Sequence, residues 1–268
     1  EEILSVYYDK YRIDNTLEKN HLIKKLGMLT YGFSGASISN LYNEASIMAI
    51  RDDNNFIKEK HFDKAIDYVM LGNEKENFMN EEEKYIVSYH EAGHALISSL
   101  LDNVPSPTKI SIIPRSKGAL GFSQSIPSYE KKLYNKEDMI SQMMVLMGGR
   151  AAEEFKFNKI TNGASDDINK INKLARDIVT VYGMSNNIGL RNIENDTKNN
   201  LWQKESKILI EKVDEDISNI INETYKTTLE LIRINSEFLE QIQKKLFDNE
   251  TIYKNDLDKI FNMDEKSF

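Results

Sequence analysis

The chain has 268 residues, of which 40% are hydrophobic and 29% charged, so it is long enough to bury one large core or two smaller ones. Its formal net charge of −8 argues against a nucleic-acid partner, because phosphate binding depends on clustered Lys and Arg. The absence of cysteine excludes disulfides, a thiol nucleophile and thiolate metal ligands, so any metal must be held by imidazole and carboxylate.

The first part of the chain, to about residue 70, is expected to form a block of short helices. Three segments have apolar residues at helical spacing: 1–11, 37–52 and 58–71. Ser34 or Ser37 is placed to cap the second of these helices. The polar stretch "GNEKENFMNEEEK", residues 72–84, is typical of a linker. The sequence therefore predicts two domains: residues 1–74 and residues 75–268.

The second block opens with an expected helix from about Asn80 to Leu101. All four prolines lie between Pro105 and Pro127, which excludes a continuous helix there. Within that segment "KISIIP" is alternating and β-branched, and "ALGFSQSI" follows after turn residues, so we expect a small sheet. The remaining helices are expected at 136–155, at 165–183, over a long stretch from 203 to 247, and near residue 256. The predicted fold class is mainly α with a small β-sheet.

Two adjacent glycines, Gly148 and Gly149, lie inside the expected helix 136–155. Glycine in a helix interior is about 1 kcal/mol less favourable than alanine. Their presence therefore predicts that another helix packs closely at this point.

The stretch "SYHEAGHALI", residues 88–97, predicts a metal site on the first helix of the second block. His90 and His94 are four residues apart and lie on one helix face, where both imidazoles can reach one ion. Glu91 is beside them, where it can accept a proton from water at the metal. The alternative is an ordinary helix, but unpaired imidazole and carboxylate groups are costly to bury in this apolar setting. The spacing is typical of zinc hydrolases.

A catalytic zinc ion needs a third protein ligand and an open position. The extended pattern with a third histidine is absent, because Ile97 and Leu100 occupy its glycine and histidine positions. The other two histidines, His21 and His61, lie in the first block. A carboxylate is therefore the expected third ligand. Sequence spacing leaves four candidates open: Glu153, Glu154, Asp166 and Asp167.

Several segments, in this order and spacing, resemble the membrane-bound AAA proteases of the FtsH type, which are ATP-dependent zinc metalloproteases. "YGFSGASISNLYNEASIMAIR" is similar to the helical lid of their ATPase module, and "SYHEAGHAL" to their zinc-binding helix. "KISIIPRSKGALGFSQ", "MMVLMGGRAAEE" and "TNGASDDINKINKLARDIVTVYGMS" resemble the segments that follow. The resemblance implies a helical AAA lid over residues 1–74 and a mostly helical zinc peptidase domain over residues 75–268.

The resemblance also implies roles for individual residues. His90, His94 and Asp167 would bind one Zn²⁺ per chain, and Glu91 would be the catalytic base. The family usually has Asn where this chain has Asp166, so the choice of Asp167 rests on the resemblance. The residues implied in lesser roles are Glu153 beside the metal, Leu120, Gly121 and Phe122 along the substrate strand, and Gly35 and Ala36 near the nucleotide.

For the whole protein, the resemblance implies a hexamer that degrades unfolded, damaged or membrane proteins. No G-x-x-x-x-G-K-[ST] phosphate loop occurs in the chain, so ATP and Mg²⁺ binding is expected only in a full-length protein. The membrane anchor is expected outside this fragment, in an organellar membrane, mitochondrial or plastid, ahead of a bacterial inner membrane. The alternative is a non-catalytic helical module that assembles or adapts an AAA complex.

Overall fold

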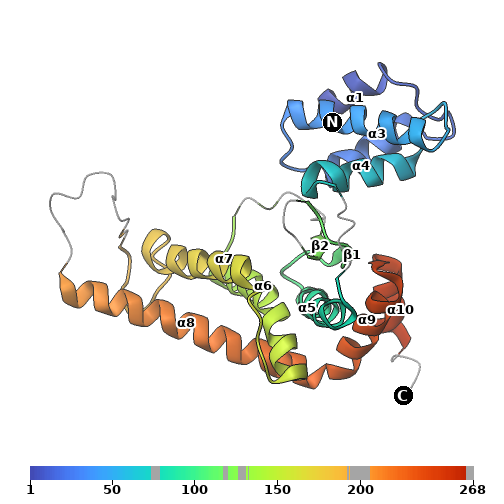
Figure 1. Ribbon diagram of the computed structural model, residues 1–268. Coiled ribbons are helices and arrows are strands. Elements are labelled where there is room, and N and C mark those ends of the chain that lie inside the picture. The colour runs from blue at the N-terminus through green and yellow to red at the C-terminus, as the bar shows by residue number, and fades with distance from the viewer. Residues whose placement is uncertain are drawn as a thin grey trace. The chain divides into compact units, whose positions relative to one another are not determined.

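The computed structural model describes residues 1–73, 79–116, 120–125, 131, 133–191, 193 and 206–263 (Figure 1). The chain divides into two compact units, one of Glu1–Phe78 with Ile113–Leu120, the other of Met79–Ile112 with Gly121–Phe268. The expected boundary at residue 74 falls outside the described residues and stays a prediction. No helix in the described part of the chain combines the length and apolarity of a membrane span.

The first unit is helical, and its core packs around Tyr42. Its phenol is fully buried, donates a hydrogen bond to the carbonyl of Leu4 at 3.0 Å and meets the ring of Phe62 edge to face. A helix that sequence patterning did not single out, α2, adds Leu22 and Leu26 to this core. The helices of this unit are α1 (Glu2–Tyr8), α2 (Lys19–Leu29), α3 (Gly35–Arg51) and α4 (Glu59–Leu71).

Polar side chains cap two helices of the first unit. Of the two candidate caps for α3, Ser34 is the one used, because its hydroxyl accepts the amide hydrogen of Ser37. His61 is buried in the first turn of α4, where its Nδ1 accepts the amide hydrogen of Lys58 at 2.9 Å. His61 thus has a local structural role in a different unit from the other buried histidines.

The segment after the first strand belongs to the first unit, which sequence spacing did not indicate. Arg115 lies 3.3 Å from the Asp67 carboxylate, and the amide of Ser116 donates to the carbonyl of Asn73. These contacts join residues 115 and 116 to α4 and to the residues just after it, although the two segments are far apart in the sequence.

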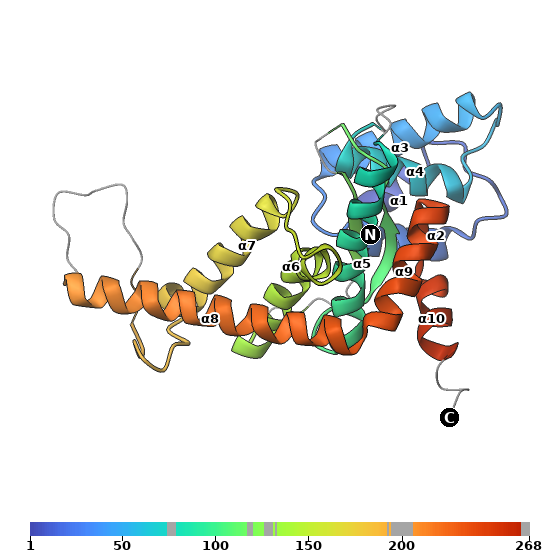
Figure 2. The same cartoon turned by 60° about the horizontal axis from the view of Figure 1, so that its bottom comes forward.

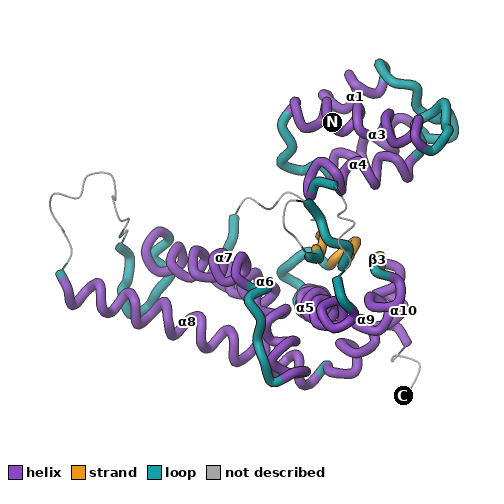
Figure 3. The backbone as a smooth tube through the Cα atoms, viewed as in Figure 1, coloured by secondary structure: helices purple, strands orange, loops and turns teal. Residues whose placement is uncertain are grey.

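The second unit is built on α5, which packs against α6, α9 and the sheet. Figures 2 and 3 show α8 running along α6 and α7, and the strands lying beside α5. The sheet is antiparallel in the order β2-β1-β3, so β2 is an outer strand. The helices are α5 (Glu81–Leu100), α6 (Lys136–Phe157), α7 (Ser165–Arg176), α8 (Lys207–Ile234), α9 (Ser236–Asn249) and α10 (Lys254–Met263). The strands are β1 (Pro107–Ser111), β2 (Phe122–Ser125) and β3 (Thr251–Tyr253).

The stretch over residues 203–247, expected to be helical, forms two helices in its described part. The chain breaks between α8 and α9 at Asn235, which has φ −103° and ψ 29° and whose side-chain amide donates to the carbonyl of Leu231. Because this side chain hydrogen-bonds to the end of α8, the next helix starts in a new direction. Further on, Glu250 at φ 59° ends α9 and leads into β3, a strand that the apolar pattern did not predict.

The expected helix over residues 165–183 changes type before its end. It is α-helical to Arg176 and continues as a π-helical turn, η1 (Asp177–Val181). Gly183, at φ 59°, follows it. Helical periodicity alone does not distinguish an α turn from a π turn.

Helices α5 and α6 meet at a pair of glycines. A Cβ added to Gly93 would lie 2.2 Å from the carbonyl oxygen of Gly148, and one added to Gly148 would lie 2.6 Å from that of Gly93. Neither contact is possible for a real Cβ, so only glycine permits this separation of the two backbones. The predicted close approach at Gly148 is confirmed, and it brings α6 against the "HEAGH" turn of α5.

Candidate metal centre

Two imidazoles of α5 converge on one point. His90 and His94 lie one helical turn apart, with their Nε2 atoms separated by 3.1 Å and their rings nearly perpendicular. Both side chains are largely buried, although neither is apolar. Two basic nitrogens held this close together are suited to share a cation.

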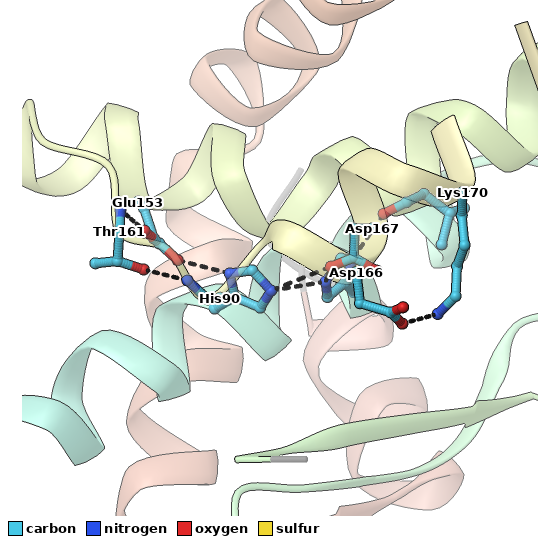
Figure 4. A network of polar contacts seen from close by, with 9 residues as sticks. His90, Glu153, Thr161, Asp166, Asp167 and Lys170 are labelled. Carbon is cyan, nitrogen blue, oxygen red and sulfur yellow. Dashed lines mark hydrogen bonds and ion pairs between the residues drawn. The ribbon is translucent and has the colours of Figure 1, made fainter. Parts of the chain in front are cut away.

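Asp167 completes the group from the first turn of α7. Its Oδ2 lies 3.5 Å from Nε2 of His90 and 3.4 Å from Nε2 of His94 (Figure 4). Among the described residues, these three form the cluster that could hold a metal ion.

The other three candidates for a third ligand point elsewhere. The side chain of Asp166 is 79% exposed and pairs with Lys170 at 2.6 Å, as Figure 4 shows. Glu154 accepts a hydrogen bond from the Tyr225 hydroxyl of α8 at 2.5 Å. Glu153 contacts His90 on Nδ1, the nitrogen that faces away from the other histidine. The fold therefore leaves Asp167 as the carboxylate at the convergence point.

Outer hydrogen bonds fix the orientation of both imidazoles. Nδ1 of His90 lies 2.6 Å from Oε1 of Glu153, and Nδ1 of His94 lies 2.7 Å from the backbone carbonyl of Val145. The second oxygen of Glu153 accepts the amide hydrogen of Thr161, in the loop that leads to α7. With Nδ1 of each ring donating to these oxygens, the Nε2 lone pairs are free to face a metal.

The distances fit a tetrahedral zinc ion. With bonds of about 2.0 to 2.1 Å, the ligand atoms of such an ion lie roughly 3.3 Å from one another. The three separations here are 3.1, 3.4 and 3.5 Å. Two imidazoles and one carboxylate are the donors of a catalytic zinc site, which leaves the fourth position for water or substrate.

The local electrostatics favour a cation at this point. Burial opposes charge on the His90 imidazole, but hydrogen bonds to Asp167 and Glu153 outweigh it and raise the pKa of His90 to about 10. Burial likewise opposes ionisation of Asp167, yet its bonds to His90 and His94 hold the pKa of this carboxyl well below its usual range. A positive charge, whether proton or metal ion, is thus stabilised between these groups.

Glu91 is buried beside the two histidines. Burial raises the pKa of its carboxyl, and the nearby imidazoles only partly oppose this shift. Gly121, at the entry to β2, lies directly against it, since a Cβ there would be 2.6 Å from Oε1 of Glu91. A shielded carboxylate beside a possible metal site is placed to accept and release a proton.

Comparison with known proteins agrees with this geometry. Residues 77–260 match the model of peptidase family M41. The chain belongs to peptidase family M41. Residues 21–64 match the AAA+ lid domain, in the unit that lies outside the metal centre.

Relatives of this M41 family member include bacterial and mitochondrial proteins. It is 36% identical over 257 residues to the ATP-dependent zinc metalloprotease FtsH of Clostridium perfringens, covering 94% of this chain and 35% of that protein. It is 36% identical over 258 residues to the mitochondrial inner membrane m-AAA protease component AFG3L2 of Mus musculus. This match covers 95% of this chain and 32% of that protein. The ATP-dependent zinc metalloprotease FtsH 4 of Synechocystis is 34% identical over 260 residues. This match covers 94% of this chain and 41% of that protein. The chain thus spans about a third of the length of the first two relatives.

The remaining residues predicted from the sequence are those of the substrate strand, 120–122, and the nucleotide-proximal Gly35 and Ala36. Phe122 is the first residue of the outer strand β2, Gly121 precedes it against Glu91, and Leu120 is half exposed. Gly35 and Ala36 form the exposed first turn of α3, in the other unit. Their assignment to substrate and nucleotide stays a prediction.

Sequence reasoning missed two backbone contacts around these histidines, that of Val145 with His94 and that of Thr161 with Glu153. Val145 acts through its carbonyl and Thr161 through its amide, so their side chains carry no signal of the role. Gly149, which lies against both imidazoles, was noted only for helix packing. The spacing of residues 145, 149 and 153 in steps of four on α6 was a usable signal, because it marks one helix face.

Proposed function

We propose that this chain is the peptidase part, with the AAA lid, of an ATP-dependent zinc endopeptidase. The observation that carries the proposal is the convergence of His90, His94 and Asp167, at distances that fit zinc, with buried Glu91 beside them. Family membership and the names of the relatives support it.

In the proposed mechanism His90, His94 and Asp167 hold the metal and Glu91 moves the proton. A zinc ion bound there supplies Lewis-acid chemistry, polarising the peptide carbonyl and lowering the pKa of water. The Glu91 carboxylate accepts the proton of the attacking water and delivers it to the nitrogen of the leaving amine. Burial raises the pKa of this carboxyl, which favours its holding the proton between the two steps. Gly121 covers one side of this carboxylate and limits its exposure to water.

We assign substrate binding to residues 120–122 and the strand that they open. Gly121 touches Glu91, so a peptide paired along this segment passes close to the proposed base. Pairing through main-chain hydrogen bonds recognises an extended backbone and few side chains. This matches unfolded, damaged or membrane proteins as substrates.

We assign ATP and Mg²⁺ binding, hexamer formation and membrane anchoring to a longer protein. The match to the AAA+ lid and the ATP-dependent relatives support the first two. Mitochondrial relatives, one named for the inner membrane, support an organellar membrane, and bacterial relatives of similar identity support a bacterial one.

The test compares Glu91→Gln with the unchanged chain. We expect about one zinc per chain in both proteins by elemental analysis, and cleavage of an unfolded protein by the unchanged chain only. The isosteric amide keeps the packing against Gly121 but cannot accept the proton. Zinc-free, well-folded protein would overturn the metal assignment. Equal cleavage by Glu91→Gln would remove Glu91 from the role of base. If the zinc-loaded unchanged chain does not cleave, the non-catalytic assembly module takes its place.

A further inference from the structure

One face of α6 follows the metal-binding turn of α5. Val145, Gly149 and Glu153 are spaced by four residues and so lie in one stripe along α6. The first contacts Nδ1 of His94 and the last contacts Nδ1 of His90. Gly149 is midway between these two hydrogen bonds, opposite the point where the imidazoles meet.

The imidazoles of His90 and His94 fill the space that a side chain at position 149 would occupy. A Cβ there would lie 2.6 Å from both Cε1 and Nε2 of His90, and 2.7 Å from Nε2 of His94. These separations are far below van der Waals contact, and the atoms involved include both nitrogens that face Asp167. Any larger residue would therefore displace those nitrogens.

Gly148, the adjacent residue, makes a different kind of contact. Its Cβ would meet the backbone of α5, 2.6 Å from the carbonyl oxygen of Gly93 and 3.1 Å from the amide nitrogen of His94. Backbone atoms cannot rotate away, whereas the ends of the two imidazoles can. The neighbouring glycines thus serve separate purposes, one in helix packing and one in the metal centre.

We propose that Gly149 is a positioning residue of the metal centre. Because Gly149 has no side chain, α6 can pack closely against both imidazoles. Glu153 and Val145 then hydrogen-bond to the Nδ1 atoms of His90 and His94, while the two Nε2 atoms converge with Asp167. This inference rests on the proposed function, because it assigns Gly149 to the same zinc site.

The test measures zinc affinity and thermal unfolding of the 268-residue chain carrying Gly149→Ala. We expect zinc to bind at least about 10-fold more weakly than to the unchanged chain, by analogy with the loss of other groups that orient ligands. The visible spectrum of bound Co²⁺, which reports tetrahedral coordination, should be lost or altered. Any fall in the metal-free melting temperature should come from the displaced imidazoles, whose hydrogen bonds to Glu153 and Val145 would be strained. The helix preference of alanine should partly offset it.

Gly148→Ala is the matched control. We expect it to lower the metal-free melting temperature, because its Cβ strikes backbone, while the protein that remains folded keeps the Co²⁺ spectrum. If Gly149→Ala also lowers the melting temperature, the substitution is repeated in a chain carrying His90→Ala and His94→Ala. With both imidazoles removed, the alanine Cβ no longer clashes with them, and Gly149→Ala should no longer lower the melting temperature.

The outcomes separate the two proposals. If the unchanged chain binds zinc and Gly149→Ala binds it equally well, this inference is overturned and the proposed function stands. A melting penalty that persists without both imidazoles also overturns it, since Gly149 would then serve packing alone. An unchanged chain that binds no zinc overturns the proposed function and this inference with it.

Discussion

Two adjacent aspartates at the start of α7 show how much depends on the direction of one side chain. Successive residues of a helix point about 100° apart, so only one of the pair can face α5. Asp167 does so with its side chain 18% exposed, whereas Asp166 is 79% exposed and pairs with Lys170. The two have the same chemistry and differ in their position on the helix.

Asp167→Asn should therefore weaken zinc binding far more than Asp166→Asn. An amide lacks the charge that stabilises the metal, and we expect a loss larger than the roughly 10- to 100-fold typical of outer partners. Asp166→Asn, which removes an exposed charge, is the matched control and should leave the affinity unchanged. Competition with a chelating indicator measures both constants. Equal losses in the two variants would contradict the assignment of Asp167.

Zinc affinity should also rise with pH. In the metal-free chain the pKa of His90 is raised to about 10, because its hydrogen bonds to Asp167 and Glu153 outweigh the effect of burial. Between pH 6 and 8, below that value, the imidazole carries a proton that zinc must displace. The apparent affinity should then increase by about 10-fold per pH unit for one proton released.

The same indicator titration at pH 6, 7 and 8 checks this slope. Calorimetry in buffers with different ionisation enthalpies counts the protons released. An affinity that does not change over this range would show that His90 is already neutral before zinc binds.

At the scale of the elements, α5, the helix of His90 and His94, is held by a carboxylate of α9. Oε2 of Glu240 accepts the hydroxyl of Tyr89 at 2.5 Å, and its Oε1 accepts Nζ of Lys156 at 2.6 Å. These contacts join α9 to α5 and to α6. Tyr89 is fully buried and precedes His90, so this junction stabilises the helix turn that carries the proposed metal ligands.

Tyr89→Phe should lower the free energy of unfolding by about 1 kcal/mol, because it removes one hydrogen bond and leaves the ring packing intact. Tyr85→Phe is the control, since the Tyr85 hydroxyl lies 3.4 Å from that of Tyr89 at a more exposed position. Denaturant unfolding of metal-free protein measures both. A loss in the control as large as in Tyr89→Phe would argue against the contact with Glu240.

At the scale of the whole molecule, the candidate metal centre belongs to one of the two units. His90 and His94 come from its first segment and Asp167 from its second. A metal ion bound by all three would therefore tie together two parts of one unit that are distant in the sequence.

Chelation of zinc should loosen the second unit and leave the first unchanged. A ligand that binds only the folded form stabilises it by mass action, and here the bound groups lie on α5 and α7. Amide hydrogen exchange with and without chelator is the measurement. We expect faster exchange in these two helices after chelation, and equal rates in α2, α3 and α4 of the first unit. A uniform change across both units would contradict a metal site confined to one.

Much of this architecture was predictable from local patterns. The paired histidines needed only the helical period, because residues four apart share a face in any α-helix. Fold class, the Ser34 cap and the close approach at Gly148 follow similarly from residue type and spacing. The strand β3 was missed, because it depends on pairing with β1, far away in the sequence. The break at Asn235 was also missed, although its hydrogen bond to Leu231 is local.

The sequence by itself predicted a metal site on one helix with a carboxylate as its third ligand. Only the tertiary structure decided which of the four candidates meets the imidazoles, and that Gly149 and Gly121 lie against them and against Glu91. The physical reason is the distance along the chain over which each feature is determined. Helical spacing is a property of neighbouring residues, whereas the rotation of α7 and the separation of α6 from α5 result from packing between segments far apart in the chain.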